Sequence, residues 1–156
     1  MGSRTRNCLI ALAILAAGPV TAQGCRDNVL RLKGDWGSAR FNVDVADTVA
    51  ERSKGLMFVE DMPSSQGMLF AYDQERPVSF WMKNTLIPLD MIFADAQGQV
   101  VSVHADAIPH DETPIPSGEP AQYVLEINGG LAERMGIVPG SVMQHPAIKD
   151  ASWACD

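Results

Sequence analysis

The chain has 156 residues, of which 12 are basic and 19 are acidic, and its formal net charge at pH 7 is −7. This length corresponds to one ordinary domain that can bury its own core. Nucleic acids and anionic membranes select for clustered Lys and Arg, so an acidic chain without a basic run argues against both as its partner.

The first 22 residues have the layout of a secretory signal peptide. Two arginines precede an apolar run at 8–17, and small residues up to Ala22 fit cleavage before Gln23. The apolar run is about half the 20 or so residues that cross a bilayer. We therefore predict a signal peptide at 1–22 and a single mature domain at 23–156, exported to the periplasm and without stable membrane insertion.

The cysteines support the same compartment. Cys8 leaves with the signal peptide, and Cys25 and Cys155 remain near the two ends of the mature chain. Two cysteines in an exported chain predict one disulfide. An alternative is that Cys25 carries a lipid anchor as the first residue of a lipoprotein; Gly24 fits that pattern, whereas the two residues before it do not.

The first predicted elements are a strand and a short helix. Apolar and polar residues alternate in FNVDVADT at 41–48, which predicts a strand with one buried face. Asp47 or Thr48 can then cap a helix at 49–57. Residues 59–67 are rich in turn formers and predict a loop.

Short strands dominate the rest of the chain. They are predicted at 68–72, at 78–84, on both sides of a hairpin turn at 95–98, and at 121–128. A short helix at 129–136 follows, and then a turn and a last short strand within 138–145. The connection at 106–120 carries four prolines and is expected to be irregular, either a functional lid or a mobile loop.

Many short strands with one or two short helices indicate the fold class. This pattern predicts a mainly β (α+β) single domain, either a small β-sandwich or a partly open β-barrel.

Four charged residues occur within otherwise apolar stretches of predicted strand or helix: Arg52, Lys83, Asp90 and Glu126. An isolated charge removed from water costs several kcal/mol, so we expect at least one buried or half-buried ion pair among the four, either as a separate pair or within one cluster of all four. Alternation along a strand at 79–84 places Lys83 beside the indole of Trp81. Such a group either organises the core or forms a pocket in which pKa values are shifted.

The motifs resemble a known family. ERSKGLM, GMLFAY, FWMKNTLIPLDMIF, YVLEINGG and GIVPGSVM occur in this order between about residues 41 and 145. Together they resemble the uncharacterised bacterial and archaeal family called domain of unknown function 192. The resemblance implies a small, mainly β fold that is often exported, and it implies no activity. Its signature falls on Arg52, Gly55, Met57, Gly67, Met68, Trp81, Met82, Lys83, Asn84, Thr85, Pro88, Asp90 and Glu126.

The first functional hypothesis is a periplasmic binding or accessory module. Its pocket is expected around Trp81, Lys83, Asn84 and Asp90, with Arg52 and Glu126 as further ligand-binding residues. An indole, an amide and charged groups suit a small polar ligand, such as a sugar or another envelope-derived fragment. An ordinary core or rim position explains Trp81 equally well.

The second hypothesis is a hydrolase or lyase acting on an envelope component. Asp90 or Glu126 would act as the base, and Lys83 would stabilise developing charge. None of the common nucleophile, phosphate-loop, dinucleotide or zinc-protease motifs occurs in the sequence.

The third and weakest hypothesis is the handling of a metal such as copper. His104, Asp106, His110 and Asp111 lie close together in the sequence, and the mature chain holds seven methionines. The spacing matches no recognised site, and methionines inside strand patterns are more often core residues. We therefore expect neither a metal nor another cofactor.

Overall fold

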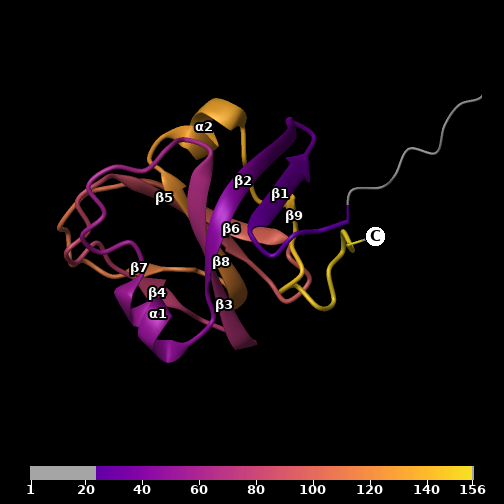
Figure 1. Ribbon diagram of the computed structural model, residues 1–156, viewed down its shortest axis with the longest axis horizontal. Helices are drawn as coiled ribbons and strands as arrows, with labels where there is room; N and C mark the ends of the chain where they lie inside the picture. The colour runs from indigo at the N-terminus through magenta and orange to yellow at the C-terminus, as the bar shows by residue number, and fades with distance from the viewer. Residues whose placement is uncertain (1–23, 156) are drawn as a thin grey trace, which may run out of the picture.

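The computed structural model describes residues 24–155, and the predicted signal peptide at 1–22 lies outside them (Figure 1). Seven strands form one sheet in the order β6-β5-β8-β3-β2-β1-β9, and β4 pairs with β7 in a second, two-stranded sheet. The elements are β1 (Val29–Gly34), β2 (Gly37–Ala46), α1 (Val49–Lys54), β3 (Gln66–Arg76), β4 (Ser79–Phe80), β5 (Leu89–Ala94), β6 (Val100–Ala107), β7 (Ile115–Pro116), β8 (Ala121–Asn128), α2 (Leu131–Met135) and β9 (Val142–Gln144).

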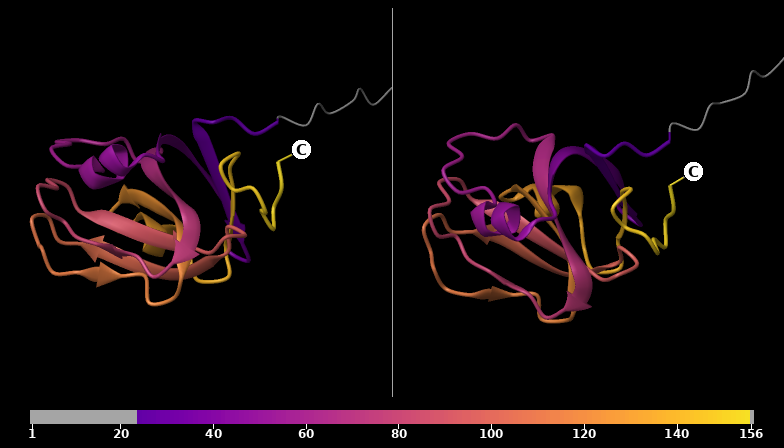
Figure 2. Two further views of the ribbon diagram at one scale, coloured as in Figure 1. Left: turned by 90° about the horizontal axis from the view of Figure 1, so that it is seen from below. Right: turned by 60° about the horizontal axis from the view of Figure 1, so that its bottom comes forward.

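The large sheet curls until its two edges meet at one end (Figure 2). Val100 on the β6 edge donates its N–H to the Ser141 carbonyl at 2.8 Å and accepts from the Gly140 N–H at 2.8 Å. An isolated bridge pairs Gln99 with Val142 of the β9 edge. The predicted mainly β fold is confirmed, and of the two predicted architectures the partly open barrel is the one formed.

Apolar side chains fill the inside of the curled sheet. Buried residues from all seven of its strands form this inner core, among them Leu30, Phe41, Leu69, Ile92, Val100, Leu125 and Met143. Leu131 and Ala132 of α2 join the same cluster and close one end. Burial of this face is the main driving force for the curl, because it removes every strand's apolar side from water at once.

A second apolar cluster covers the outside of β3, β8 and β5. Phe70, Val124 and Phe93 lie in one row across these strands, and the ring of Phe80 from β4 packs edge-on against both phenylalanines. In Figure 1, α1, β4 and β7 lie together at the end of the molecule away from α2. Strand β5 is therefore buried on both faces.

The short helix α1 is positioned by its cap. The Thr48 hydroxyl accepts the Glu51 N–H at 3.2 Å, and the Glu51 carboxylate accepts the Thr48 N–H at 3.0 Å. Of the two predicted caps, Thr48 is the one used, in a capping box. The helix ends at Gly55, whose φ of 49° and close approach to the Phe70 ring favour glycine.

Two strands were not predicted, and one predicted strand is much shorter. Strand β1, which pairs along its length with β2, was missed, as was β7 inside the proline-rich connection. The predicted strand at 78–84 ends after Phe80, because the chain turns where the Thr85 N–H donates to the Met82 carbonyl at 3.1 Å. Trp81 and Lys83 therefore do not alternate on a strand.

The connection at 106–120 is attached along the segment that carries Trp81. The Met82 N–H donates to the Asp111 carbonyl at 2.8 Å, and the Ser117 N–H donates to the Val78 carbonyl at 2.9 Å. Ile115 pairs with Phe80 and is buried. This segment is thus part of the wall around the outer cluster.

Cys25 and Cys155 form the predicted disulfide, with 5.4 Å between their Cα atoms and 130 residues between them in the chain. No helix within residues 24–155 is long and apolar enough to cross a membrane.

Replacing both cysteines with alanine should destabilise the domain, since the bond restricts a long loop in the unfolded chain. The expected loss is about 5 kcal/mol in the chain-entropy model, which corresponds to well over ten degrees in melting temperature. Thermal melts of the variant and of the parent with and without reductant measure it. Equal melting temperatures would contradict a stabilising role for the bond.

Candidate functional site

The register of β5 against β8 separates two of the predicted site residues. Met91 pairs with Glu126, whereas Asp90 pairs with Ile127. Paired residues of antiparallel strands project to the same side, and their neighbours project to the other. Asp90 therefore points to the inner side with Ile127, and Glu126 points to the outer side. The predicted single cluster of charges is wrong, because the sheet lies between these carboxyl groups.

Asp90 is fully buried and organises the end of the barrel. Its Oδ1 accepts the N–H groups of Asp106 at 2.7 Å and Gly130 at 2.9 Å, and its Oδ2 accepts the Ala132 N–H at 2.7 Å. Helix α2 has no cap from its own N-cap glycine, so the strand residue provides one. These backbone groups satisfy the buried carboxylate without the expected ion pair.

Lys83 and Asn84 also have local roles. The Lys83 ammonium lies over the Trp81 ring, 5.0 Å from its centroid. Asn84 adopts a positive φ of 53°, which asparagine tolerates, and its carbonyl accepts the Phe58 N–H at 2.8 Å. Asn84 thus shapes the turn after Trp81.

The outer face carries a cavity of about 260 Å³ next to Glu126. Its wall is formed by α1 and the turn after it, β3, β4 and β8. The lining residues are Arg52, Ser53, Lys54, Gly55, Leu56, Met57, Phe70, Tyr72, Ser79, Phe80, Trp81, Thr85 and Glu126. Of the six predicted ligand-binding residues, Arg52, Trp81 and Glu126 meet here. We call this space the aromatic cavity.

Glu126 is the unusual group in the aromatic cavity. It is only 4% exposed and lies between Met68 and Met91 in the register of the sheet. Within residues 24–155 its carboxyl group makes no hydrogen bond. Every fully enclosed side-chain polar atom described there has a partner, so this carboxyl group is not fully enclosed. Burial raises its pKa from an ordinary 4.5 to about 8. At neutral pH most molecules therefore carry a protonated, uncharged Glu126.

Arg52 faces the aromatic cavity but is held by backbone and aromatic contacts. Its Nη1 donates to the carbonyls of Asp47 and Ala71, the latter at 2.8 Å. Its guanidinium lies over the Tyr72 ring, 4.9 Å from the centroid. Burial raises the pKa of Tyr72, while Arg52 and Arg76 act to lower it. The cation is thus oriented by Tyr72 rather than by Glu126.

Several cavity residues were missed in the sequence. Tyr72 and Phe70 belong to the period-two pattern of MLFAY, which placed them on one strand face but did not show what covers that face. Phe80 and Met57 come from segments whose spatial proximity depends on the fold. The alternation within MLFAY was the signal that could have placed Met68, Phe70 and Tyr72 on one face.

The histidines do not assemble into a metal site. Among residues 24–155, no group of three or more His, Cys, Asp or Glu residues is placed to hold a metal ion. His104 and His110 are exposed. His145 is buried, where its Nε2 contacts the Asp27 carbonyl at 2.9 Å and its Nδ1 accepts the Ala147 N–H at 3.1 Å.

A family profile matches residues 30–145, which cover more than half of the chain. The chain belongs to DUF192, the family described as Uncharacterized ACR. The motifs that resemble this family lie within the matched residues. Asp90 and Glu126, two members of the expected signature, lie on opposite faces of the family's sheet in this chain.

Two solved structures resemble this DUF192 protein. A protein of unknown function from Novosphingobium aromaticivorans is 43% identical, with a TM-score of 0.72 over 74% of this chain and 82% of that one. A protein described as a candidate transcription regulator from Sinorhizobium meliloti is 38% identical, with a TM-score of 0.75 over 80% of this chain and 97% of that one. Comparison with curated proteins finds no match.

Asp90→Asn should destabilise the DUF192 fold. The amide nitrogen would replace one carboxylate oxygen and face a backbone N–H, so a charge-assisted hydrogen bond is lost and a buried donor is left unpaired. We expect a loss of about 3 kcal/mol, or roughly ten degrees in melting temperature. Exposed Asp44→Asn is the matched control, and Lys83→Met should cost less than about 1 kcal/mol. Equal melting of Asp90→Asn and Asp44→Asn would refute the structural role of Asp90.

Glu126→Gln should remove a pH dependence of stability. The folded pKa of Glu126 is raised, so the unfolded chain loses its proton first, and stability falls as pH rises from about 4.5 to about 8. The expected fall is a few kcal/mol. Burial lowers the pKa of His145 from its ordinary 6.5. Its contribution to the free energy of unfolding therefore increases as pH rises toward 6.5, opposite to that of Glu126. The difference in melting temperature between the parent and Glu126→Gln at each pH isolates the contribution of Glu126. Melting temperatures that change with pH in parallel for the two proteins would contradict its raised pKa.

Proposed function

We propose that this protein is an exported binding module that takes a small polar ring ligand, such as a saccharide from the cell envelope, in the aromatic cavity. The observation that carries the proposal is the buried carboxyl group of Glu126, which has no hydrogen bond within residues 24–155 and borders a cavity. Every fully enclosed side-chain polar atom within residues 24–155 has a partner, so the carboxyl group of Glu126 keeps some exposure, and the residue lines the aromatic cavity. A ligand hydroxyl in the cavity would hydrogen-bond to this carboxyl group.

The rest of the aromatic cavity supports a ring-shaped ligand. Trp81 is 47% exposed although it belongs to an apolar stretch. Lys83 covers part of the indole, while the indole also lines the cavity beside Phe80. A flat aromatic surface next to a hydrogen-bonding group suits the apolar face and the hydroxyl groups of a sugar.

Two observations support export. The disulfide joins Cys25 to Cys155, and such bonds persist in oxidising compartments such as the periplasm. The sequence before Gln23 has the charge and apolar pattern of a signal peptide. The disulfide also occupies Cys25, which argues against the lipid-anchor alternative.

A hydrolase or lyase is the second candidate, and Glu126 alone favours it. A carboxyl group with a pKa of about 8 can act as a general acid at neutral pH. Asp90 does not support this reading, because its oxygens accept three backbone N–H groups on the other side of the sheet. Incubating a bound saccharide with the protein and analysing it for cleavage separates the two candidates.

The description of the Sinorhizobium meliloti relative suggests nucleic-acid binding as a further possibility. A formal net charge of −7 disfavours contact with a phosphate backbone. We therefore prefer the small-molecule ligand.

A titration followed by NMR tests the binding proposal. Titration with peptidoglycan-derived and hexose oligosaccharides should shift the Trp81 indole N–H signal saturably. The indoles of Trp36 and Trp153 lie away from the aromatic cavity and serve as controls in the same sample. Absence of a response across the panel would overturn the saccharide assignment.

Glu126→Met and Trp81→Ala should each weaken binding about tenfold or more. Methionine fills the space between Met68 and Met91 without a polar group, so this variant should be at least as stable as the parent. Lost binding then reflects the missing hydrogen bond rather than unfolding. Trp153→Phe is the matched aromatic control and should bind normally.

A further inference from the structure

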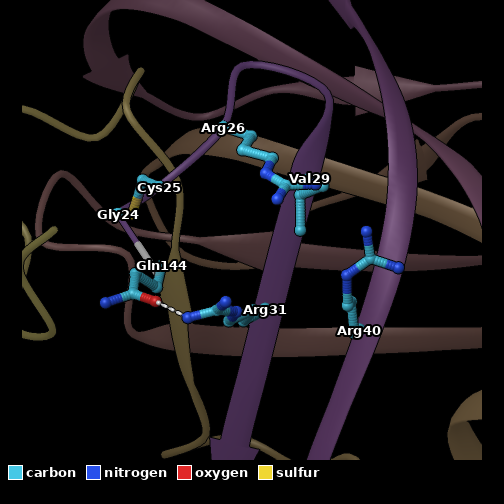
Figure 3. Close-up of a pocket in the computed structure, with 7 residues that line it drawn as sticks. All are labelled: Gly24, Cys25, Arg26, Val29, Arg31, Arg40 and Gln144. Carbon is cyan, nitrogen blue, oxygen red and sulfur yellow. Dashed lines mark hydrogen bonds between the residues drawn. The ribbon is translucent and has the colours of Figure 1, made fainter. Parts of the chain in front are cut away.

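A second hollow lies far from the aromatic cavity, on the outer side of β1, β2 and β9. Figure 3 shows three arginines, Arg26, Arg31 and Arg40, around it, together with Gln144. Its volume is about 140 Å³, and its lining consists of Gly24, Cys25, Arg26, Val29, Arg31, Arg40 and Gln144. We call it the arginine hollow.

The sheet register places two of these cations directly opposite each other. Arg31 of β1 pairs with Arg40 of β2, on the side opposite the buried Leu30 and Leu32. Like charges in opposite positions of a strand pair destabilise it. Arg31 turns toward Gln144 of β9, on the other side of β1 from Arg40, and an anion in the hollow would offset the positive charge of both side chains.

Arg31 is oriented by a chain of hydrogen bonds. Its Nη1 donates to Gln144 Oε1 at 3.4 Å, and Gln144 Nε2 donates to the Ala154 carbonyl at 2.6 Å. The Gln144 side chain is buried. Ala154 is next to Cys155, so the disulfide to Cys25 holds both walls of the hollow together. The site is thus built from residues that are distant in the sequence.

The charge balance of this face differs from that of the whole chain. The sequence is acidic, with 19 acidic and 12 basic residues. Arg26, Arg31 and Arg40 nevertheless line the hollow. Within residues 24–155, the lining contains no Asp or Glu side chain. The local positive charge is therefore not neutralised by a carboxylate of the lining.

The size and chemistry of the hollow select the ligand class. Its volume of about 140 Å³ is much smaller than the 260 Å³ of the aromatic cavity, which favours a small ion over a ring-shaped ligand. Planar guanidinium groups bind tetrahedral oxyanions through paired N–H donors. We propose that the arginine hollow binds a phosphate group, either inorganic phosphate or the phosphate of a lipid headgroup. This proposal is independent of the saccharide ligand.

The test is an NMR titration of residues 23–156, which contain the whole described fold. Inorganic phosphate replaces chloride at constant ionic strength. We expect saturable shifts of the arginine side-chain signals and of backbone amides near Arg31, Arg40 and Gln144. Non-saturating shifts, or shifts spread over all basic residues, would overturn the proposal.

Variants make the site assignment specific. Arg31→Gln and Arg40→Gln should each weaken phosphate binding at least tenfold, since each removes a charged donor from a different strand. Arg134→Gln on α2 removes the same charge elsewhere and should leave the affinity unchanged. An affinity that is insensitive to Arg31→Gln and Arg40→Gln would refute the site.

A second arm identifies the source of the phosphate. Vesicles of phosphatidylcholine with and without phosphatidylglycerol are sedimented with the parent and the Arg40→Gln variant. Binding that requires phosphatidylglycerol and Arg40, and is displaced by inorganic phosphate, assigns a lipid headgroup. Saturable binding of inorganic phosphate without vesicle binding assigns the free anion. Binding in neither arm would overturn the proposal.

Discussion

The antiparallel register between β5 and β8 is the constraint on which the rest of the structure depends. Both strands lie in the middle of the large sheet and are covered on both faces. Pairing Met91 with Glu126 sends Asp90 to one side and Glu126 to the other. A shift by one residue would exchange these sides and place each carboxyl group in the wrong environment.

The two carboxyl groups show how environment assigns different roles to similar side chains. Asp90 lies where three backbone N–H groups converge, so its charge stabilises the start of α2 and the end of β6. Glu126 lies among methionines and aromatic rings, where burial favours the neutral form. The first arrangement is architectural, whereas the second leaves hydrogen-bonding capacity available to a ligand.

Each of the two proposed sites contains an arrangement of polar or charged groups that is unfavourable without a ligand. In the aromatic cavity the carboxyl group of Glu126 lies in an apolar setting and has no hydrogen-bond partner within residues 24–155. In the arginine hollow, cations are placed opposite each other on the sheet. Natural sequences retain such locally unfavourable arrangements mainly at functional sites, where a ligand or partner compensates the cost.

The sequence by itself determined the elements whose signals are local. The period-two pattern of 41–48, a helix cap at Asp47 or Thr48, the DAQG hairpin and the disulfide pair follow from neighbouring residues or from a count, and the structure contains them with Thr48 as the cap. The family motifs also identified DUF192 and singled out Arg52, Trp81 and Glu126. The strand β1 was missed although its alternation with Leu30 and Leu32 is visible in the sequence.

Only the tertiary structure decided which of the charged residues meet. Alternation shows that Asp90 and Glu126 stand on apolar strands, but the side that each faces depends on the pairing of Asp90 with Ile127 and of Met91 with Glu126. The turn after Phe80 depends on a hydrogen bond from Met82 to distant Asp111. The pairing of Arg31 with Arg40 and the closure of the hollow by Gln144 likewise require the curled sheet. These long-range contacts depend on packing and register, which no local pattern encodes.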